Sequence, residues 1–582
     1  MAFSRDRRYV SASAGDFEPT VEEWLIEEEV LDDVNSDDSD LDPEYHPLVT
    51  DIESDDHSTS SCSESDADIS VSVTSPPTAG TFISRNGTVW QHDSPVSSRT
   101  LAHNIITWTS GPKRGITTST PKQAWDYFVT QNIIDEILLC SNLEGRRIAT
   151  EKGKTWRQIT VDEINAFFGL LLLAGVEKSW DVPVRELFLD QKQNPLYRAT
   201  MSVNRFEDIR RVIRFDDRRT RASRAQTDKL AAFRYVWEMF IGNCQNVMTP
   251  NAYLTIDEQL LSFRGRCSFV QYMPKKPAKY GIKIFWLCDS KDSYAINGTI
   301  YTGRKPNEPV QKNLARGVVN NLAKIVEGSS RNITFDNFFC SVPLAEEMLQ
   351  KGITVVGTLR PNKPDIPKEM LPSALREIKS SLFGFKGKVT MVSYVPKKKR
   401  AVILISTMHH DKAIDSNNMK NKPEIICFYN ETKGGVDQMD QKVKNYTCKR
   451  QTRRWPFVLW MNVMDVAALN SQILFSAQNS EFYPKRNDTR RLFLKDLSFE
   501  LVRNLMERRA NQPNLPKSLQ HALSLCGIVR PEPTPETFRC VQQRRRCSFC
   551  PYERHRKSTM VCEKCNRSVC KEHSHIVCSS CL

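Results

Sequence analysis

Long apolar segments are scarce in this chain of 582 residues. The most lipid-like run, residues 166–176 (AFFGLLLLAGV), is far shorter than the ~20 residues that a membrane-spanning helix needs. Thr160 and Glu163 precede this run with the spacing of a capping box, which predicts a buried helix of a soluble domain. The first ten residues are polar and basic and no apolar core follows them. We therefore expect no secretory signal and no framework of disulfides.

Basic residues are missing between Val10 and Ser84. Asp16 to Asp68 contains 21 carboxylates, so residues 1–84 carry a net charge of −19 and the remainder carries +32. A folded body with so much positive charge implies a polyanionic partner, for which nucleic acid is the usual candidate. A membrane surface is less favoured, because no basic amphipathic helix with an aromatic face is evident.

Residues 1–105 are acidic and rich in serine, and we expect them to be disordered. Two interpretations of this tail remain open. It is either a solubilising segment or a regulatory segment that competes with DNA for the basic body.

Hydrophobic periodicity divides the remaining chain into segments of different texture. Apolar residues at three- and four-residue spacing indicate helices, and short β-rich runs broken by turn residues indicate strands. The pattern predicts a multidomain α/β protein. It begins with helices over residues 121–247, continues with strands and then alternating helix and strand over 253–361, and has a β-rich insertion over 362–423. A strand at Glu424–Tyr429, a helix from Val436, a long helix from Pro456 and a stiff linker over 526–543 follow.

Cysteine is sparse until the end of the chain, where seven of the 17 cysteines fall in the last 36 residues. Ligand pairs separated by two residues suit zinc, because a tight turn can aim both side chains at one ion. Four such pairs provide ligands for two tetrahedral sites, and so short a segment, residues 544–582, needs metal to fold. Interleaved pairing predicts one site at Cys547, Cys550, Cys570 and His573 and another at Cys562, Cys565, Cys578 and Cys581. His575 can replace His573 in this scheme.

The function of such a module is less specific than its metal binding. RING and PHD modules share the layout and bind proteins. Arg544, Arg545 and Arg546 at its start favour DNA binding, a nuclear-import signal, or both. A structural module with a solvated basic face is the remaining alternative.

Three aspartates occupy positions that suit phosphoryl transfer. Asp257 lies in a β-type segment (LTIDEQLL), Asp336 ends an apolar strand (NITFDNFF), and Asp437 begins a helix on which Asp440 follows. Two divalent ions about 3.5–4 Å apart serve phosphodiester chemistry, and magnesium prefers carboxylate oxygens. Carboxylates on a strand, on its neighbour and on a helix against the sheet describe a ribonuclease-H-like site. Each aspartate taken singly also fits a surface turn or a helix cap.

Several longer strings resemble piggyBac transposases: LTIDEQLLSFRGRCSF, YMPKKPAKYGIKIFWLCDS, RNITFDNFF, YNETKGGVDQMDQ and TCKRQTRRWPF. RFEDIRRVIRFDD and the Cys/His tail are similar as well, so the resemblance covers about residues 105–582. It implies a ribonuclease-H-like catalytic domain, a mixed sheet with flanking helices, interrupted by a β-rich insertion domain and followed by a cross-brace zinc domain. The implied domains are residues 253–361 with 424–446 (catalytic), 362–423 (insertion), 106–252 with 447–525 (helical, for dimerisation and DNA binding) and 544–582 (zinc).

The resemblance also implies an activity, which is cut-and-paste transposition in the nucleus by a homodimer or a higher assembly. Its acidic triad falls on Asp257, Asp336 and Asp437, with Asp440 as a further required carboxylate. Two Mg²⁺ or Mn²⁺ ions per catalytic site and two structural Zn²⁺ per chain are expected. The DNA partners would be transposon terminal inverted repeats and TTAA target sites, with nicking, hairpin formation and opening, and strand transfer as the steps.

Two alternatives compete with an active transposase. One is a host-adapted DNA-binding protein that has lost cutting, and the four intact carboxylates argue against it. The other is a nuclear protein-binding factor that uses the tail as a RING or PHD module. That alternative leaves the basic body and the acidic motifs unexplained.

Basic residues near these motifs are candidates for holding DNA through its phosphates. The resemblance places Arg360 and Lys363 at contacts with target DNA. Lys397–Arg400 (KKKR) is either a DNA contact or an import signal. Trp455 and Phe338 can stack on bases, although core packing is the simpler role for Phe338. The full set of candidates is Arg264, Arg266, Lys275, Lys276, Lys279, Asn337, Ser341, Arg360, Lys363, Lys449, Arg450, Arg453, Arg454, Arg544, Arg545 and Arg546.

Overall fold

The structure is a computed structural model, and most of the expected acidic tail lies outside the residues that it describes. The expected linker also lies largely outside them, as do the zinc-ligand candidates Cys578 and Cys581. The described residues are 80–95, 105–106, 108–189, 194–274, 276–303, 313–415, 421–483, 488–512, 515–529, 544–562, 565 and 567–575.

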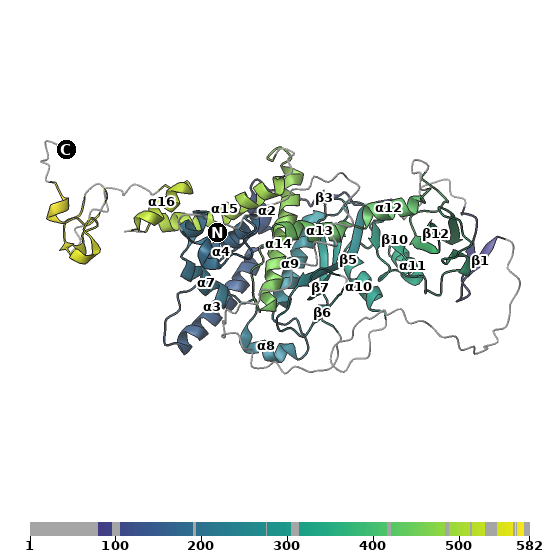
Figure 1. The fold of residues 1–582 in the computed structure, drawn as a ribbon, viewed down its shortest axis with the longest axis horizontal. Helices are drawn as coiled ribbons and strands as arrows, with labels where there is room; N and C mark the ends of the chain where they lie inside the picture. The colour runs from purple at the N-terminus through teal and green to yellow at the C-terminus, as the bar shows by residue number, and fades with distance from the viewer. Residues whose placement is uncertain are drawn as a thin grey trace, which may run out of the picture. The chain divides into compact units, whose positions relative to one another are not determined.

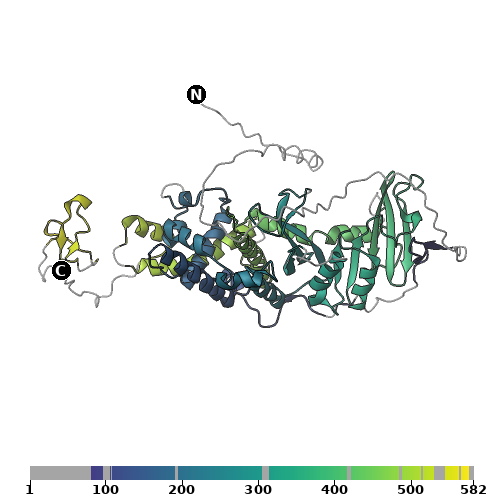
Figure 2. The same ribbon diagram turned by 90° about the horizontal axis from the view of Figure 1, so that it is seen from below.

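Two helical regions, one early and one late in the chain, pack into a single bundle. Helix α4 (Val161–Val176) begins with the predicted capping box, in which Thr160 Oγ1 accepts from Glu163 N at 3.3 Å and Glu163 Oε2 accepts from Thr160 N at 3.2 Å. Helix α15 (Thr489–Ala510) lies so close to α4 that a Cβ at Gly169 would be 2.9 Å from the Ser498 carbonyl oxygen. Figure 2 shows these early helices in blue against the late helices in yellow-green.

The other helices of the two regions are α2 (Pro121–Asp126), α3 (Gln131–Glu151), α5 (Val184–Leu187), α6 (Leu196–Thr200), α7 (Val203–Val212), α8 (Arg218–Ala225), α9 (Arg234–Val247), α14 (Trp455–Gln478) and α16 (Lys517–Leu525). Among the described helices, α14 alone has the length and hydropathy of a membrane span, but 89% of its most apolar window is buried inside the protein. Phe168 and Phe215 pack on Trp460 of α14, with ring centroids 5.1 and 5.5 Å away. We therefore interpret α14 as the core helix of the bundle.

A mixed sheet forms the middle of the chain. Its strands are β1 (Thr81–Ile83), β2 (Val89–Gln91), β5 (Tyr253–Ser262), β6 (Val270–Tyr272), β7 (Tyr280–Asp289), β8 (Ala295–Ile300), β9 (Asn332–Phe335), β10 (Thr354–Thr358), β11 (Ser381–Lys386), β12 (Val389–Lys397) and β13 (Arg400–Ser406). The order is β1-β2-β11-β12-β13-β10-β9-β5-β7-β6, with β8 on β7. The β5–β9 and β9–β10 pairs are parallel, and the others are antiparallel.

Helices cover this sheet, so the predicted fold class, a mixed sheet with flanking helices, is confirmed. They are α10 (Leu314–Ala323), α11 (Val342–Gln350), α12 (Glu424–Thr432) and α13 (Gly435–Asn445). In Figure 1, α12 and α13 lie above the strands and α10 and α11 lie below them. A separate short pair joins β3 (Gly111–Pro112) to β4 (Met248–Thr249).

The β-rich insertion extends this same sheet. Residues 362–423 contain β11, β12 and β13, and β13 pairs with β10 of the parallel strands. The insertion is therefore continuous with the strands that carry the acidic motifs.

Part of the tail that we expected to be disordered is ordered. Residues 81–91 form the hairpin β1–β2, which adds to the sheet beside β11. Trp90 is fully buried, and its indole Nε1 donates to the Asp365 carbonyl at 3.0 Å. The prediction of disorder over residues 1–105 was wrong here, because the average composition of a long acidic segment conceals a short apolar hairpin.

The strand predicted at residues 424–429 is also wrong, since these residues form helix α12. Pro423 precedes the helix at its N-cap position, and Ile425 and Ile426 are buried while Tyr429 is half-buried. A short apolar run has no clear period, so it fits a strand and a helix equally well.

Candidate active site and metal centre

Parallel pairing of β5 with β9 brings Asp257 and Asp336 to the same level of the sheet. The register joins Ile256 to Phe335, and each aspartate is the next residue of its chain segment. Asp336 begins a turn in which its carboxylate accepts a hydrogen bond from Phe338 N at 2.9 Å. The backbone of the sheet therefore positions both carboxylates.

Helix α13 supplies Asp437 in its first turn. The helix approaches β5 because Gly435 has no side chain, and a Cβ there would lie 2.6 Å from Thr255 Oγ1. Thr255 Oγ1 also donates to the Thr432 carbonyl at 2.6 Å, which fixes the end of α12 on the same strand. A larger residue at position 435 would push α13 off the sheet and move Asp437 away from Asp257.

The three aspartates interact electrostatically. Burial raises the pKa of Asp257 to about 8, and the negative charges of Glu258, Asp336 and Asp437 add to this effect. Burial also raises the pKa of Asp336, against the opposing hydrogen bond from Phe338 N. A buried group with this excess of negative charge favours a bound cation, and carboxylate oxygens are the ligands that magnesium prefers. These residues therefore fit the divalent ions that the sequence predicts.

A buried network of amides holds Asp440. Gln259 Nε2 donates to Asp440 Oδ1 at 2.8 Å, and Lys444 Nζ pairs with Asp440 Oδ2 at 2.6 Å. Gln259 Oε1 accepts from Trp286 Nε1 at 3.0 Å and from Asn462 Nδ2 at 3.1 Å. Because Asn462 belongs to α14, the network connects the helical bundle to a carboxylate beside the acidic triad.

We expect Gln259→Leu to weaken metal binding at the acidic site by about 10-fold, because Asp440, the further carboxylate on the helix that carries Asp437, would lose its buried donor and its fixed orientation. The measurement is the Mg²⁺ dissociation constant by isothermal titration calorimetry. Asn142→Leu is the control, since it removes a buried amide of α3 that bonds Trp156 and Ile159. Equal Mg²⁺ dissociation constants for the two variants would contradict this role of Gln259.

A second cluster lies in the C-terminal module. The ligand atoms of Cys547, Cys550, Cys570 and His573 all lie within 4.8 Å of one another. His573 Nδ1 is 3.3 Å from Cys570 Sγ, so His573 is the histidine of this group. This set of thiols and imidazole is the donor set of a tetrahedral zinc site.

The second predicted zinc site is described only in part. Cys562 and Cys565 are described, and an antiparallel bridge joins Val561 to Ser568, which flank them in the sequence. Cys578 and Cys581 lie outside the described residues, so the second set of four ligands stays a prediction.

Comparison with known proteins assigns the family. Residues 120–472, more than half of the chain, match a family model described as transposase IS4. A cryo-EM structure of a piggyBac transposase synaptic complex with hairpin DNA matches with a TM-score of 0.70 and 36% sequence identity, over 82% of this chain and 100% of that one. This chain is a piggyBac-type transposase family member.

Two human relatives are more distant. PiggyBac transposable element-derived protein 3 is 23% identical over 355 residues, which are 58% of this chain and 58% of that protein. PiggyBac transposable element-derived protein 2 is 24% identical over 354 residues, which are 56% and 57% of the two chains. This chain thus spans little more than half the length of the curated relatives that it matches.

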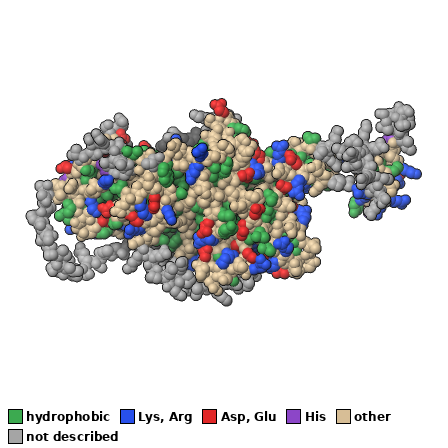
Figure 3. All heavy atoms as spheres, turned by 180° about the vertical axis from the view of Figure 1, so that it is seen from behind, with side chains coloured by type: hydrophobic (Ala, Val, Ile, Leu, Met, Phe, Trp, Pro, Cys, Tyr) green, Lys and Arg blue, Asp and Glu red, His purple; other side chains and the backbone are tan. Residues whose placement is uncertain are grey.

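Several candidate DNA contacts of the transposase are exposed, namely Arg264, Arg266, Lys279, Asn337, Arg453, Arg544 and Arg545. Arg360 and Lys363 are half-buried, and Arg360 Nε donates to Asn337 Oδ1 at 3.1 Å next to Asp336. Lys276 pairs with Glu258 at 3.6 Å, Arg546 lies 3.9 Å over the Tyr552 ring, and Lys275 is outside the described residues. On the face in Figure 3, Lys and Arg side chains lie among Asp and Glu, so basic charge there comes in small clusters.

Two of the candidates donate hydrogen bonds to the protein's own backbone, and one of them, Arg450, is buried. Arg450 is only 5% exposed and donates to the carbonyls of Ser179 and Val182. Arg454 donates to the Ile213 carbonyl at 2.9 Å and lies over the Phe457 ring. Both guanidinium groups join the start of α14 to the early helices. A run of basic residues in the sequence does not reveal in which direction their side chains point.

Four further candidates have structural contacts. Lys449 Nζ donates to the Ser262 carbonyl at 2.6 Å, and Ser341 Oγ caps α11 by accepting from Leu344 N at 3.4 Å. Phe338 stacks on Phe285 with ring centroids 6.2 Å apart, so core packing accounts for it. Trp455 packs edge-on against Phe269 at 5.1 Å.

Sequence reasoning missed three side chains near the acidic triad. After burial, the charge of Glu258 is the largest contribution to the raised pKa of Asp257. Burial raises the pKa of Tyr429, which bonds Thr358 and feels the charges of Asp336 and Asp257. Gln259 is the third. All three lie in the strings that carry the resemblance, next to residues already singled out, and that proximity was the available signal.

Proposed function

We propose that this chain is an active transposase that nicks, joins and thereby moves DNA. The observation that carries the proposal is the grouping of half-buried Asp257 and Asp336 with exposed Asp437, where burial and then the charges of Glu258, Asp336 and Asp437 raise the pKa of Asp257. Asp440 follows Asp437 on the same helix and is held by Gln259. Carboxylates that repel one another at a partly buried site have no evident structural benefit, and they suit a site that binds divalent ions.

The proposed reaction is cut-and-paste transposition. Two divalent ions bound by Asp257, Asp336 and Asp437 would supply activation of the attacking oxygen and stabilisation of the leaving oxygen. Each transposon 3′ end is nicked, the freed 3′-OH forms a hairpin that is then opened, and the ends join target DNA at TTAA. Every step is a displacement at phosphorus, so one rigid set of carboxylates can serve them all. The hairpin DNA of the solved relative supports this sequence of steps.

The proposed partners are double-stranded transposon ends and target DNA, bound in the nucleus by a homodimer or a higher assembly. The net charge of +32 beyond residue 84 supports a DNA partner. The C-terminal module would contribute through two structural zinc ions and through Arg544 and Arg545, which are exposed.

A DNA-binding protein that no longer cuts is the second candidate. It is favoured by the human relatives, whose names describe them as derived from a transposable element. The presence of all four carboxylates in this chain favours the active enzyme.

A strand-cleavage assay tests the proposal. The full chain is mixed with labelled transposon-end DNA flanked by TTAA, in Mg²⁺ or Mn²⁺ and in EDTA. We expect metal-dependent nicks at the 3′ ends followed by hairpins. Binding of the end sequence without cutting would support the second candidate, and the lack of both binding and cutting would refute the two together.

A further inference from the structure

The turn between β12 and β13 carries four consecutive basic residues, Lys397, Lys398, Lys399 and Arg400, and all four are exposed. None of them has an ion-pair or hydrogen-bond partner for its side chain within the described part of the chain. This hairpin tip therefore holds four positive charges that no residue in the described part of the chain neutralises.

Two features of the hairpin tip are unfavourable for its local structure. The register places Lys397 directly opposite Arg400, and like charges in facing positions destabilise a strand pair. Lys399 has φ of +60°, in the left-handed region that disfavours side chains other than glycine or asparagine. Residues that destabilise their local structure without stabilising another part of the fold are typical of binding surfaces.

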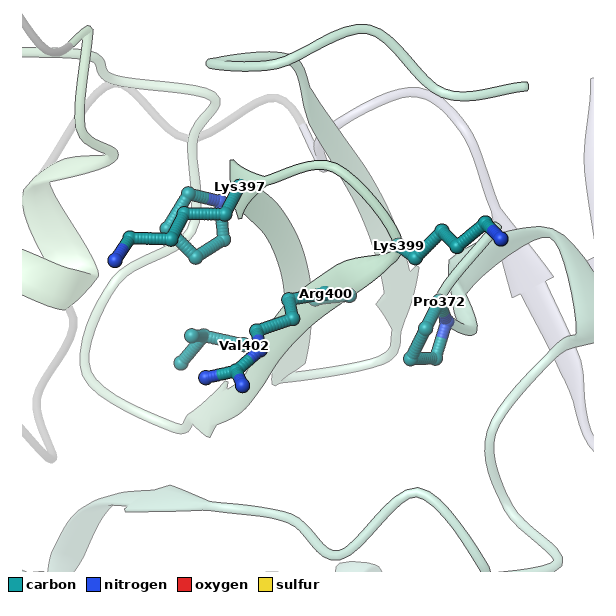
Figure 4. Close-up of a pocket in the computed structure, with 7 residues that line it drawn as sticks. Pro372, Lys397, Lys399, Arg400 and Val402 are labelled. Carbon is teal, nitrogen blue, oxygen red and sulfur yellow. The ribbon is translucent and has the colours of Figure 1, made fainter. Parts of the chain in front are cut away.

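An open hollow of about 350 Å³ lies against the tip, lined by Lys397, Lys399 and Arg400 together with Pro372, Pro396, Ala401 and Val402. None of these seven described residues is acidic. Figure 4 shows Lys397 and Arg400 directed to the same side as Val402, with Lys399 directed to the other side near Pro372. Cations directed to two sides suit an extended polyanion with repeated charges better than a single small anion.

The backbone of the tip helps to choose between the two partners that a KKKR string suggests. β12 and β13 pair from Thr390 with Ser406 to Tyr394 with Val402, and after a register shift Lys397 pairs with Arg400, so the basic residues are held at the end of a closed hairpin. A receptor that reads an import signal as an extended peptide would have to break this pairing. The DNA backbone needs only exposed charges on a rigid support.

We propose that the β12–β13 tip contacts the phosphate backbone of double-stranded DNA, independently of base sequence. The proposal rests on the proposed function, in that DNA is the partner of this chain, and it adds the β12–β13 tip to the candidate DNA contacts named above. Since β13 pairs with β10, and β10 with β9, DNA held at the tip is coupled through one sheet to the strand that precedes Asp336.

The test compares two variants of the full chain that lose equal charge. The tip variant is Lys397→Gln/Lys398→Gln/Arg400→Gln, and the control is Lys368→Gln/Lys388→Gln/Lys412→Gln, at exposed residues of the same insertion. The dissociation constant is measured against salt concentration for a transposon-end duplex and for an unrelated duplex. Each lost phosphate contact lowers the slope of log affinity against log salt by about 0.9, so we expect a drop of about 2 to 3 for the tip variant on both duplexes. The control should keep the parental slope.

Equal slopes for the two variants, with normal nicking by the parent, would overturn this contact alone. A parent that binds DNA but does not cut leaves the comparison valid, because the comparison measures affinity only. A tip variant with the parental slope that no longer accumulates in the nucleus would assign the tip to an import receptor instead.

Discussion

Asp336→Asn should lower the rate of strand nicking at least about 1,000-fold, since the several kcal/mol of transition-state stabilisation that a metal site supplies would be lost. Asparagine keeps the size of the side chain and an oxygen that can accept from Phe338 N. In the parent this hydrogen bond joins Phe338 N to Asp336 Oδ1 at 2.9 Å. It removes the negative charge that a divalent ion requires. The rate is measured on labelled transposon-end DNA at saturating Mg²⁺.

Folding and DNA affinity should survive this substitution. Asp336 is a buried carboxylate whose pKa is raised by burial and by the charge of Glu258, so its charge is unfavourable to the metal-free fold. The thermal midpoint of the variant should therefore equal or exceed that of the parent. Asp411→Asn, at an exposed residue of the insertion, is the control and should nick normally. Near-parental nicking by Asp336→Asn would place the active site elsewhere.

Cys550→Ser should unfold the C-terminal module and release its zinc. Among the described residues after 543, the buried apolar side chains are Cys547, Val569 and Cys570, and two of these are proposed ligands. The burial of one valine cannot offset the conformational entropy that the module loses when it folds, whereas structural zinc binding contributes roughly 10–16 kcal/mol of free energy. Zinc content by mass spectrometry should fall by at least one ion per chain, and limited proteolysis should become fast within residues 544–575.

Acidification should release the zinc from the parent as well. Burial opposes ionisation of Cys547, but backbone NH groups, beginning with that of Phe549, outweigh it and lower the pKa of Cys547 to about 6. Zinc binds the thiolate, so protons compete with zinc for Cys547 as the pH falls through this value. Cys526→Ser, at a half-buried thiol before the module, should keep the parental zinc content. Full zinc content in Cys550→Ser would rule out the proposed ligand set.

The spacing of residues along the sequence was enough to predict several features. The Cys-x2-Cys pairs predicted the ligand group that the structure assembles, with His573 in it. The capping box at Thr160 and the strand Asn332–Phe335 lie where they were predicted. In the capping box the determining interactions join residues only three positions apart, and the strand depends on the pattern of side chains along one element. The ligand pairs are likewise local, although the two pairs of the group are about 20 residues apart. The acidic residues themselves were found through family strings, and the residues alone left a surface turn or cap open for each.

The tertiary structure decided everything that depends on partners distant in the chain. Arg450 turns inward because carbonyls 271 and 268 residues away accept from it, and Trp90 is buried because Asp365, 275 residues on, provides its acceptor. Gln259 reaches Asp440 across 181 residues. Charge, periodicity and spacing describe which groups a chain carries and which face of an element they share. The direction of a side chain depends on what packs against that face, and only the assembled fold supplies that neighbour.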